Sequence, residues 1–139
     1  MAHPPCRAWS AYCGHQAKPE PGEKELGPLC VEWLRKEGGV LEHPAHSRLF
    51  RACGLPEPGK RRGDFFTLPV MQAWWGFDLP KKTWLVLCGV DPRQLEIPWS
   101  EVPAGAHAAW KRKSKHQRAA TCDELAHWLV SVARTARVS

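Results

Sequence analysis

The chain has 139 residues, which suits one domain with a modest hydrophobic core, and residues 1–139 are therefore expected to form a single domain. Its 20 lysines and arginines outnumber its 14 aspartates and glutamates, and the net charge of +6 favours anionic partners such as nucleic acid. No apolar run reaches the roughly 18 residues that a membrane helix needs, and no secretory pattern opens the sequence, so we expect a cytoplasmic protein without a membrane partner.

Six cysteines are spread along the chain, and several lie within apolar runs, as Cys30 and Cys88 do. This distribution predicts reduced thiols and not a disulfide framework. The chain also holds eight tryptophans, a residue that serves cores, protein interfaces and base-stacking surfaces alike.

The N-terminal segment places Cys6 directly after Pro4 and Pro5, which fix the backbone that leads to the thiol. After a polar connector at residues 16–22, apolar residues recur at three- and four-residue spacing and predict a helix over residues 23–36. Its buried stripe is expected to consist of Leu26, Leu29, Cys30, Trp33 and Leu34. The glycines that follow it are expected to end the helix.

Three strands are predicted in the middle of the chain. The first runs from about Gly39 to Glu42, and a helical turn at residues 45–50 and a basic loop at 54–64 follow it. The second covers residues 65–73, where an internal proline is typical of an edge strand. The third covers residues 83–90, and its continuous apolar character predicts burial on both faces.

The C-terminal part begins with a proline-rich loop at residues 91–106 and a densely basic run at residues 111–118. A final helix is predicted over residues 122–136, with Thr121 as its N-cap and Glu124 at the capping-box spacing. Its apolar face is expected to hold Leu125, Trp128, Leu129 and Val132. These elements predict an α/β fold, a partial Rossmann-like methyltransferase sheet of about three strands flanked by helices.

Several separated stretches carry a resemblance to one family. Pro4-Pro5-Cys6-Arg7-Ala8-Trp9-Ser10 resembles the Pro-Cys loop of DNA cytosine-5 methyltransferases. Val40-Leu41-Glu42-His43-Pro44 is similar to that family's strand ending in Glu-Asn-Val, with Glu42 at the glutamate and His43 replacing asparagine. Residues 70–77 and 81–87 are similar to its aromatic-x-glycine turn and closing strand, and residues 118–126 to its Arg-x-x-Thr-x-x-Glu helix start.

The resemblance implies a chemistry in which a cysteine thiolate adds to C6 of a flipped cytosine while a carboxylic acid hydrogen-bonds to N3. Cys6 and Glu42 are the candidate catalytic residues in these ancestral roles. Lys81 or Lys82 would hold the base or its phosphate. The other candidate nucleic-acid contacts are Ser10, Lys111, Arg112, Lys113, Lys115 and Arg118.

Each candidate also has a plain structural interpretation. Cys6 suits an ordinary loop thiol, Glu42 a strand-end carboxylate paired with Arg48, and the basic run a solvated surface. A zinc site of His3, Cys6, Cys13 and His15 is too irregular in spacing, and His43 with His46 has only a helical ligand spacing, so no metal is expected. A zinc deaminase is also disfavoured, because it needs His-x-Glu before Pro-Cys-x-x-Cys and this sequence has neither that order nor the second cysteine.

The sequence departs from the family at two places. The Gln-x-Arg-x-Arg pattern falls near Leu79, Lys81 and Thr83, where the glutamine and one arginine are gone. In that family a glycine-rich segment that binds S-adenosylmethionine precedes the Pro-Cys loop, and no such segment precedes Cys6 in this sequence. We therefore expect the chain alone to bind no cofactor. S-adenosylmethionine is expected only if a missing half is supplied. The resemblance therefore implies a truncated, catalytically incomplete relative of phage or mobile-element type.

Three hypotheses follow. The first is a protein that binds DNA or a DNA-handling host protein complex. The second is a phage-type inhibitor of a host defence system, anti-CRISPR or anti-restriction, with an exposed patch at Trp74 and Trp75 that would equally suit a homodimer. The third is an active cytosine-5 methyltransferase whose donor-binding half is supplied in trans.

Overall fold

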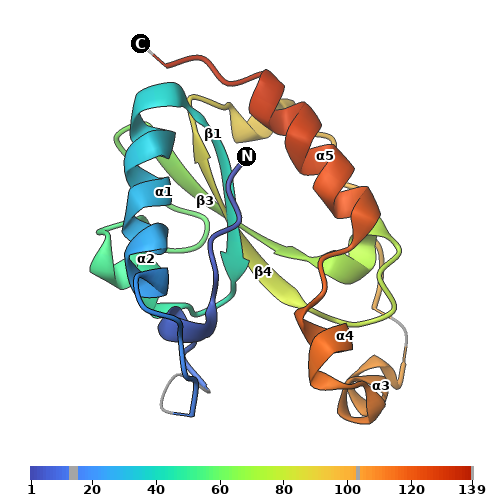
Figure 1. Cartoon of the computed structure of the whole chain (residues 1–139). Helices are drawn as coiled ribbons and strands as arrows, with labels where there is room; N and C mark the ends of the chain where they lie inside the picture. Colours follow the sequence, from blue (N-terminus) through green and yellow to red (C-terminus); the bar gives the residue numbers. More distant parts are fainter. Residues whose placement is uncertain (13–15, 103, 139) are drawn as a thin grey trace.

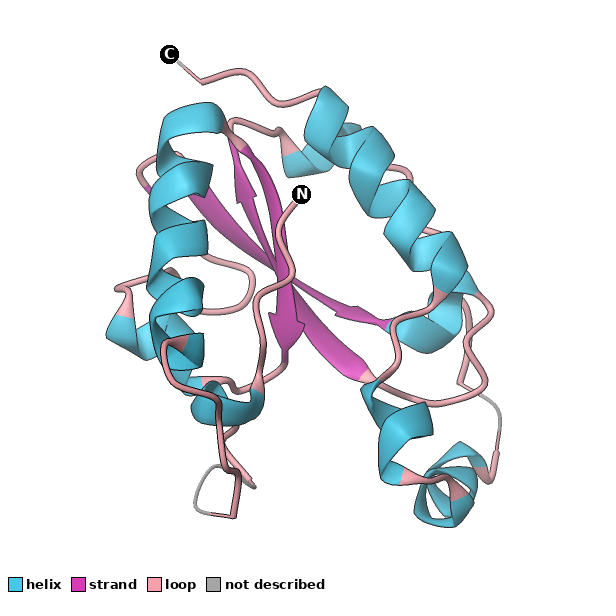
Figure 2. Ribbon diagram, viewed as in Figure 1, coloured by secondary structure: helices cyan, strands magenta, loops and turns pink. Residues whose placement is uncertain are grey.

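A four-stranded sheet forms the centre of the computed structural model, which describes residues 1–12, 16–102 and 104–138. The strand order is β1-β4-β3-β2, with β1 at Gly39–Pro44, β2 at Arg61–Arg62, β3 at Phe65–Met71 and β4 at Lys82–Cys88. On one face lie α1 (Glu23–Glu37) and α2 (Arg48–Ala52), and on the other lies α5 (Asp123–Arg134) (Figure 1, Figure 2). The smaller elements are the 3-10 turns η1 (Arg7–Trp9), η2 (Gln72–Trp75) and η3 (Pro92–Gln94) and the helices α3 (Ala106–Arg112) and α4 (Lys115–Ala119).

The three pairings between these strands are antiparallel. The mixed α/β class is thus confirmed, whereas a Rossmann-like arrangement of parallel strands is not. The short link of residues 72–81 between β3 and β4 explains this, because a parallel pair needs a crossover of a dozen residues or more. Two isolated parallel contacts do occur, where Ala2 bridges to Leu41 beside β1 and where Pro58 bridges to Thr67 of β3.

Strand β4 is buried on both faces, as its sequence predicts. Val86 and Cys88 pack into the core under α1, and Leu85 and Leu87 pack into the core under α5. Each of these four side chains has no more than 1% of its surface exposed. The predicted second strand ends earlier than expected, at Met71, because the chain turns into η2 there.

Helix α1 has the predicted position, and of its predicted stripe Leu34 is buried and Cys30 packs against the core, but the rest of the stripe faces outward. Leu26, Leu29 and Trp33 are 42%, 41% and 56% exposed, so the prediction of a buried stripe through them was wrong. The buried residues of the helix are Glu23, Gly27, Val31 and Leu34. Gly27 explains the difference, because a side chain there would meet Leu49 Cδ1 and Trp9 Nε1 at 2.8 Å, so the glycine lets α1 pack closely on this side.

The basic run at residues 111–118 forms two short helices, α3 and α4, where the sequence indicated no regular structure. A capping box in which Ser114 and Gln117 bond reciprocally starts α4. The capping box predicted for α5 was wrong: Cys122 is its N-cap, and Glu124 accepts a hydrogen bond from the Cys122 thiol at 3.2 Å. The predicted apolar face of α5 is confirmed, with Leu129 and its neighbours in the core.

The predicted tryptophan patch was also wrong. Trp75 is buried and packs against Trp128 of α5 with the ring centroids 5.0 Å apart, and Trp74 is partly buried. The exposed tryptophans of the described chain are Trp33 and Trp99. No helix in the described ranges combines the length and the apolar character that crossing a bilayer requires.

Candidate functional site

The candidate site lies at one end of the sheet, where β1 and β3 finish beside the start of β4 at Lys82. A pocket of about 410 Å³ opens there. We name it the Cys6 pocket; its lining includes His3, Cys6, Tyr12, His46, Lys81, Lys82, Trp110 and Arg118. These residues come from the N-terminal loop, the turn after β1, the start of β4 and the two short helices. The fold therefore brings together segments more than a hundred residues apart.

The loop that carries Cys6 is held firmly against α1 and α2. Arg7 forms an ion pair with the buried carboxylate of Glu23 at the start of α1. The Trp9 ring lies in the core and its Nε1 donates to the backbone carbonyl of Lys24 at 3.1 Å. The Ser47 hydroxyl donates to the carbonyl of Trp9 at 3.2 Å. These contacts fix the position of the Cys6 thiol in advance of any ligand.

Glu42 lies behind the pocket and not in its lining. Its carboxylate is 1% exposed, and its Oε2 lies 2.8 Å from Nε2 of His3, which does line the pocket. This contact raises the pKa of His3 above its usual 6.5, against the opposing effect of burial. His3 thus covers Glu42, and a ligand in the pocket would reach the carboxylate only if His3 moved. The alternative pairing of Glu42 with Arg48 does not occur, because Arg48 instead donates to Ala8 O at 3.2 Å.

Lys81 is a buried cation that joins the sheet to α4. Its Nζ donates to the carbonyls of Ala119 at 3.2 Å and Ala120 at 3.0 Å, where α4 ends. Burial lowers the pKa of Lys81, and the negative charge of Glu42 opposes that change. Lys81 therefore positions α4 and its Arg118 over the pocket, while the neighbouring Lys82 is exposed and directly available to a ligand.

The Cys6 thiol is not activated as a nucleophile in this structure. Burial raises its pKa above the usual 9.0, and the positive charge of Lys81 offsets this only in part. The thiolate fraction at neutral pH is correspondingly small, and the thiolate is the reacting species of a cysteine. Cations do lie around the sulfur in this pocket, but burial outweighs their effect on the thiol and raises its pKa.

Aromatic rings form much of the pocket wall. The Arg118 guanidinium lies 5.9 Å from the centroid of the Trp110 ring, and Tyr12 meets His46 edge to face at 6.5 Å. The His46 ring is in turn 4.8 Å from Trp84. His46 also has a φ of 64°, a left-handed conformation that is uncommon outside glycine and often marks functional sites.

The predicted nucleic-acid residues fall into two groups. Lys81, Lys82 and Arg118 line the pocket, as does Cys6. The rest lie outside it: Lys111, Arg112 and Lys115 are exposed on α3 and α4, Lys113 pairs with Asp78 at 2.5 Å, and Ser10 follows η1.

Sequence reasoning missed Trp110 and considered His3 and His46 only as metal ligands. Trp110 directly precedes the basic run, so an aromatic residue beside five cations was a usable signal. No sequence signal marked His46 or His3 as a pocket residue. The role of His46 depends on its backbone conformation, and that of His3 depends on a contact with Glu42, which lies far from it in the sequence.

No group of three or more His, Cys, Asp and Glu side chains that suits a metal ion occurs among the described residues. The weighed zinc site included Cys13 and His15, which lie outside the described residues. Its other two members, His3 and Cys6, both line the pocket, with His3 paired to Glu42. His46 is exposed while the His43 ring is fully buried, so the helical ligand spacing between these two has no structural basis.

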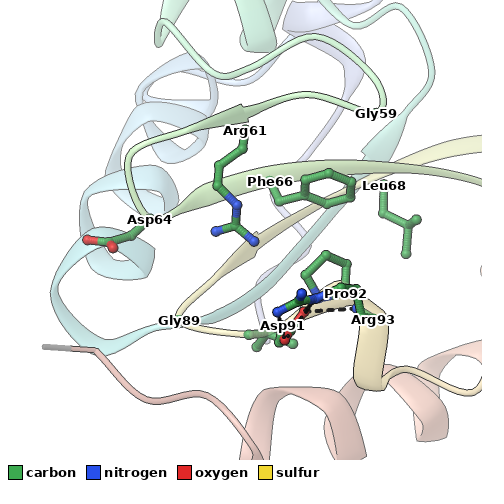
Figure 3. A pocket seen from close by; sticks show the side chains of 10 residues that line it. Gly59, Arg61, Asp64, Phe66, Leu68, Gly89, Asp91, Pro92 and Arg93 are labelled. Atoms are coloured by element: carbon green, nitrogen blue, oxygen red, sulfur yellow. Dashed lines mark hydrogen bonds and ion pairs between the residues drawn. The ribbon is translucent and has the colours of Figure 1, made fainter.

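A larger hollow, of about 820 Å³, lies at the other end of the sheet, beside the start of β3 and the end of β4 (Figure 3). Arg61 points into it beside Arg93, whose guanidinium is bound to the Asp91 carboxylate at 2.8 Å, while the Asp64 carboxylate points away from both (Figure 3). Asp91 thus neutralises Arg93, and the hollow lies at the opposite end of the sheet from the Cys6 pocket.

Comparison of the chain with protein-family models, with curated proteins and with solved structures found no match in any of the three.

Proposed function

We propose that this chain binds DNA by accepting an unpaired base in the Cys6 pocket, and that it acts by binding and not by methyl transfer. The observation that carries the proposal is the convergence of Cys6, Lys82, Trp110 and Arg118 from distant segments on one pocket. Cations beside exposed aromatic rings are the combination that binds the phosphates and the faces of unpaired bases.

The size and chemistry of the pocket support a base as its ligand. At about 410 Å³ it falls within the range of small-molecule sites in proteins, roughly 300–1,000 Å³. Its rings offer flat apolar surface to the face of a base, and Lys82 and the His3 imidazole offer polar groups to its edge. The net charge of +6 attracts DNA from a distance.

Two observations favour binding over turnover. Burial raises the pKa of the Cys6 thiol, so little thiolate is present to attack a cytosine. Glu42, which would have to meet N3 of the base, is covered by His3. In this proposal S-adenosylmethionine is bound only where a second chain supplies its site.

Fluorescence anisotropy with a labelled cytosine-containing oligonucleotide tests the proposal. Trp110→Ala should weaken binding by about 5-fold to 150-fold, because stacking one base on an aromatic ring contributes about 1–3 kcal/mol. The matched control is Trp99→Ala, since Trp99 is 68% exposed and does not line the pocket, and it should bind like the wild type. Absence of binding at low salt, or an equal loss in both variants, would refute the proposal.

A second candidate function rests on the exposed apolar stripe of α1, formed by Leu26, Leu29 and Trp33. An inhibitor that docks on a host DNA-handling complex would use such a surface. The test is phage infection of a host with an active restriction or CRISPR system that expresses this chain. Trp33→Asp should abolish protection while leaving oligonucleotide binding unchanged; no protection by the wild type would exclude this candidate.

A further inference from the structure

The Cys6 pocket continues into a longer groove along the end of the sheet. A hollow of about 270 Å³ shares Ala45, His46 and Lys82 with it and adds Trp84. A third hollow, of about 600 Å³, shares His46 and Trp84 with the second. The three hollows are therefore contiguous around His46, and they run from α4 at one side of the sheet end to α2 at the other.

Three arginines line the far hollow: Arg48 and Arg51 from α2, and Arg62 from β2. Two of them are held in place, since Arg48 Nη2 donates to Ala8 O at 3.2 Å and Arg62 Nη1 donates to Gly54 O at 2.8 Å. Each bond uses only one of the five N–H donors of a guanidinium. None of the three forms an ion pair with a carboxylate in the part of the chain that the structure describes.

The far hollow therefore carries a positive charge that the protein itself does not neutralise. Glu57 also lines it, which leaves an excess of two positive charges over the three arginines and one carboxylate. The three guanidinium groups are exposed, so water and salt screen much of their mutual repulsion, and an anion between them would reduce it further. Guanidinium groups match the oxygens of both phosphates and carboxylates in geometry, so the arginines alone suit either anion.

The wall between the two charged ends is aromatic. Ring centroids are separated by 6.5 Å from Tyr12 to His46, by 4.8 Å from His46 to Trp84 and by 5.0 Å from Trp84 to Phe50. Phe50 is buried in the core, so Tyr12 and His46 are the exposed rings of this wall, and an acidic peptide would satisfy the arginines but leave those two rings uncovered. A strand of unpaired nucleotides suits both the rings and the arginines, because its bases stack on aromatic side chains and its backbone carries phosphates.

We propose that Arg48, Arg51 and Arg62 bind backbone phosphates of an unpaired DNA strand whose base lies in the Cys6 pocket and whose neighbouring nucleotide crosses His46 and Trp84. The inference rests on the proposed function, since it extends the ligand from one base to a strand. The left-handed backbone conformation of His46 contributes to this proposed site, because it places the imidazole ring where the hollows meet.

The test compares the triple variant Arg48→Gln, Arg51→Gln, Arg62→Gln with a control that removes three charges elsewhere, Lys36→Gln, Arg134→Gln, Arg137→Gln. Binding of a labelled single-stranded decamer is measured between 50 and 200 mM salt. Each phosphate contact on a single strand contributes about 0.7 to the slope of log K against log salt, so the triple variant should lose about 2 from the slope. Over that salt range, the wild type should therefore weaken about 20-fold more than the triple variant. The control should keep the wild-type slope.

Three further measurements separate the possible failures. Suppose that the wild type binds the decamer and Trp110→Ala weakens that binding. An unchanged slope of log K against log salt in the arginine variant would then overturn the arginine subsite alone. No binding of the decamer by the wild type overturns the proposed function with it. Competition by polyglutamate as strong as by the decamer would overturn the phosphodiester assignment, and equal affinity for a duplex of the same length would overturn the unpaired strand.

Discussion

The sharpest prediction concerns His43, the residue next to Glu42 on β1. Its ring is fully buried, and burial lowers its pKa from 6.5 to about 4 although Glu42 and the Pro5 carbonyl oppose the change. The unfolded chain therefore takes up a proton at His43 as the pH falls below 6.5, while the folded chain does not until about pH 4. Acidification across this window must destabilise the fold.

The size of the effect follows from the two pKa values. The interval from 6.5 to about 4, at about 1.36 kcal/mol per pH unit, gives a loss of about 3 kcal/mol of unfolding free energy. His3 does not interfere, because its pKa is raised: the stability it contributes is complete below 6.5 and is lost only as the pH rises through its folded pKa. The two histidines thus act in separate pH windows.

The assay is urea unfolding followed by tryptophan fluorescence, in steps from pH 7.5 to pH 4.0, on the wild type and on His43→Leu. Leucine keeps an apolar side chain of similar volume at the site but has no titratable group. Other carboxylates titrate alike in both proteins, so the difference between the two profiles isolates His43. We expect the wild type to lose about 3 kcal/mol more than the variant over this range. Parallel profiles would refute the assignment of a buried, neutral His43.

The other predictions concern the site and the packing of α1. Cys6→Ser should bind the oligonucleotide within about 2-fold of the wild type, because a mostly protonated thiol contributes no covalent bond; a loss above tenfold would mean that the sulfur itself contacts the ligand. His46→Gly should unfold at equal or higher urea, since glycine relieves about 1 kcal/mol of left-handed strain, yet bind at least about 5-fold more weakly because the ring is gone; unchanged affinity would remove His46 from the groove. Gly27→Ala should lower the unfolding free energy by about 1–3 kcal/mol in the same urea assay, because the new methyl group overlaps Trp9 and Leu49, and an unchanged midpoint would show that the helix can shift.

Much of the fold was predictable because local patterns determined it. The continuous apolar run of β4 led directly to a central strand buried on both faces, and α5 shows the apolar face that its spacing indicates. The face that α1 buries was not predictable from spacing. Leu26, Leu29 and Trp33 form an equally good stripe, and the choice was made by the close approach that Gly27 allows.

The site was predictable in part. Cys6 and Lys82 were singled out through the resemblance to a methyltransferase family and Arg118 through the basic run, and the structure brings all three to one pocket. The cover that His3 places over Glu42 was not predictable, because it depends on the pairing of the N-terminal segment with the edge of β1. The three groove arginines were also missed, since Arg48 and Arg51 of α2 lie apart in the sequence from Arg62 of β2 and only the fold brings them to one hollow. The resemblance to cytosine-5 methyltransferases stays a hypothesis of function.

Photocrosslinking tests the central claim, binding of an unpaired base in the Cys6 pocket, most directly. A single-stranded oligonucleotide with one photoreactive pyrimidine would be irradiated with the protein, and the crosslinked residues would be identified by mass spectrometry. The account predicts that the crosslinks fall on the pocket rings, Trp110, His46 or Tyr12, and that excess unlabelled oligonucleotide suppresses them. Crosslinks confined to the exposed stripe of α1, or to Trp99, would contradict it.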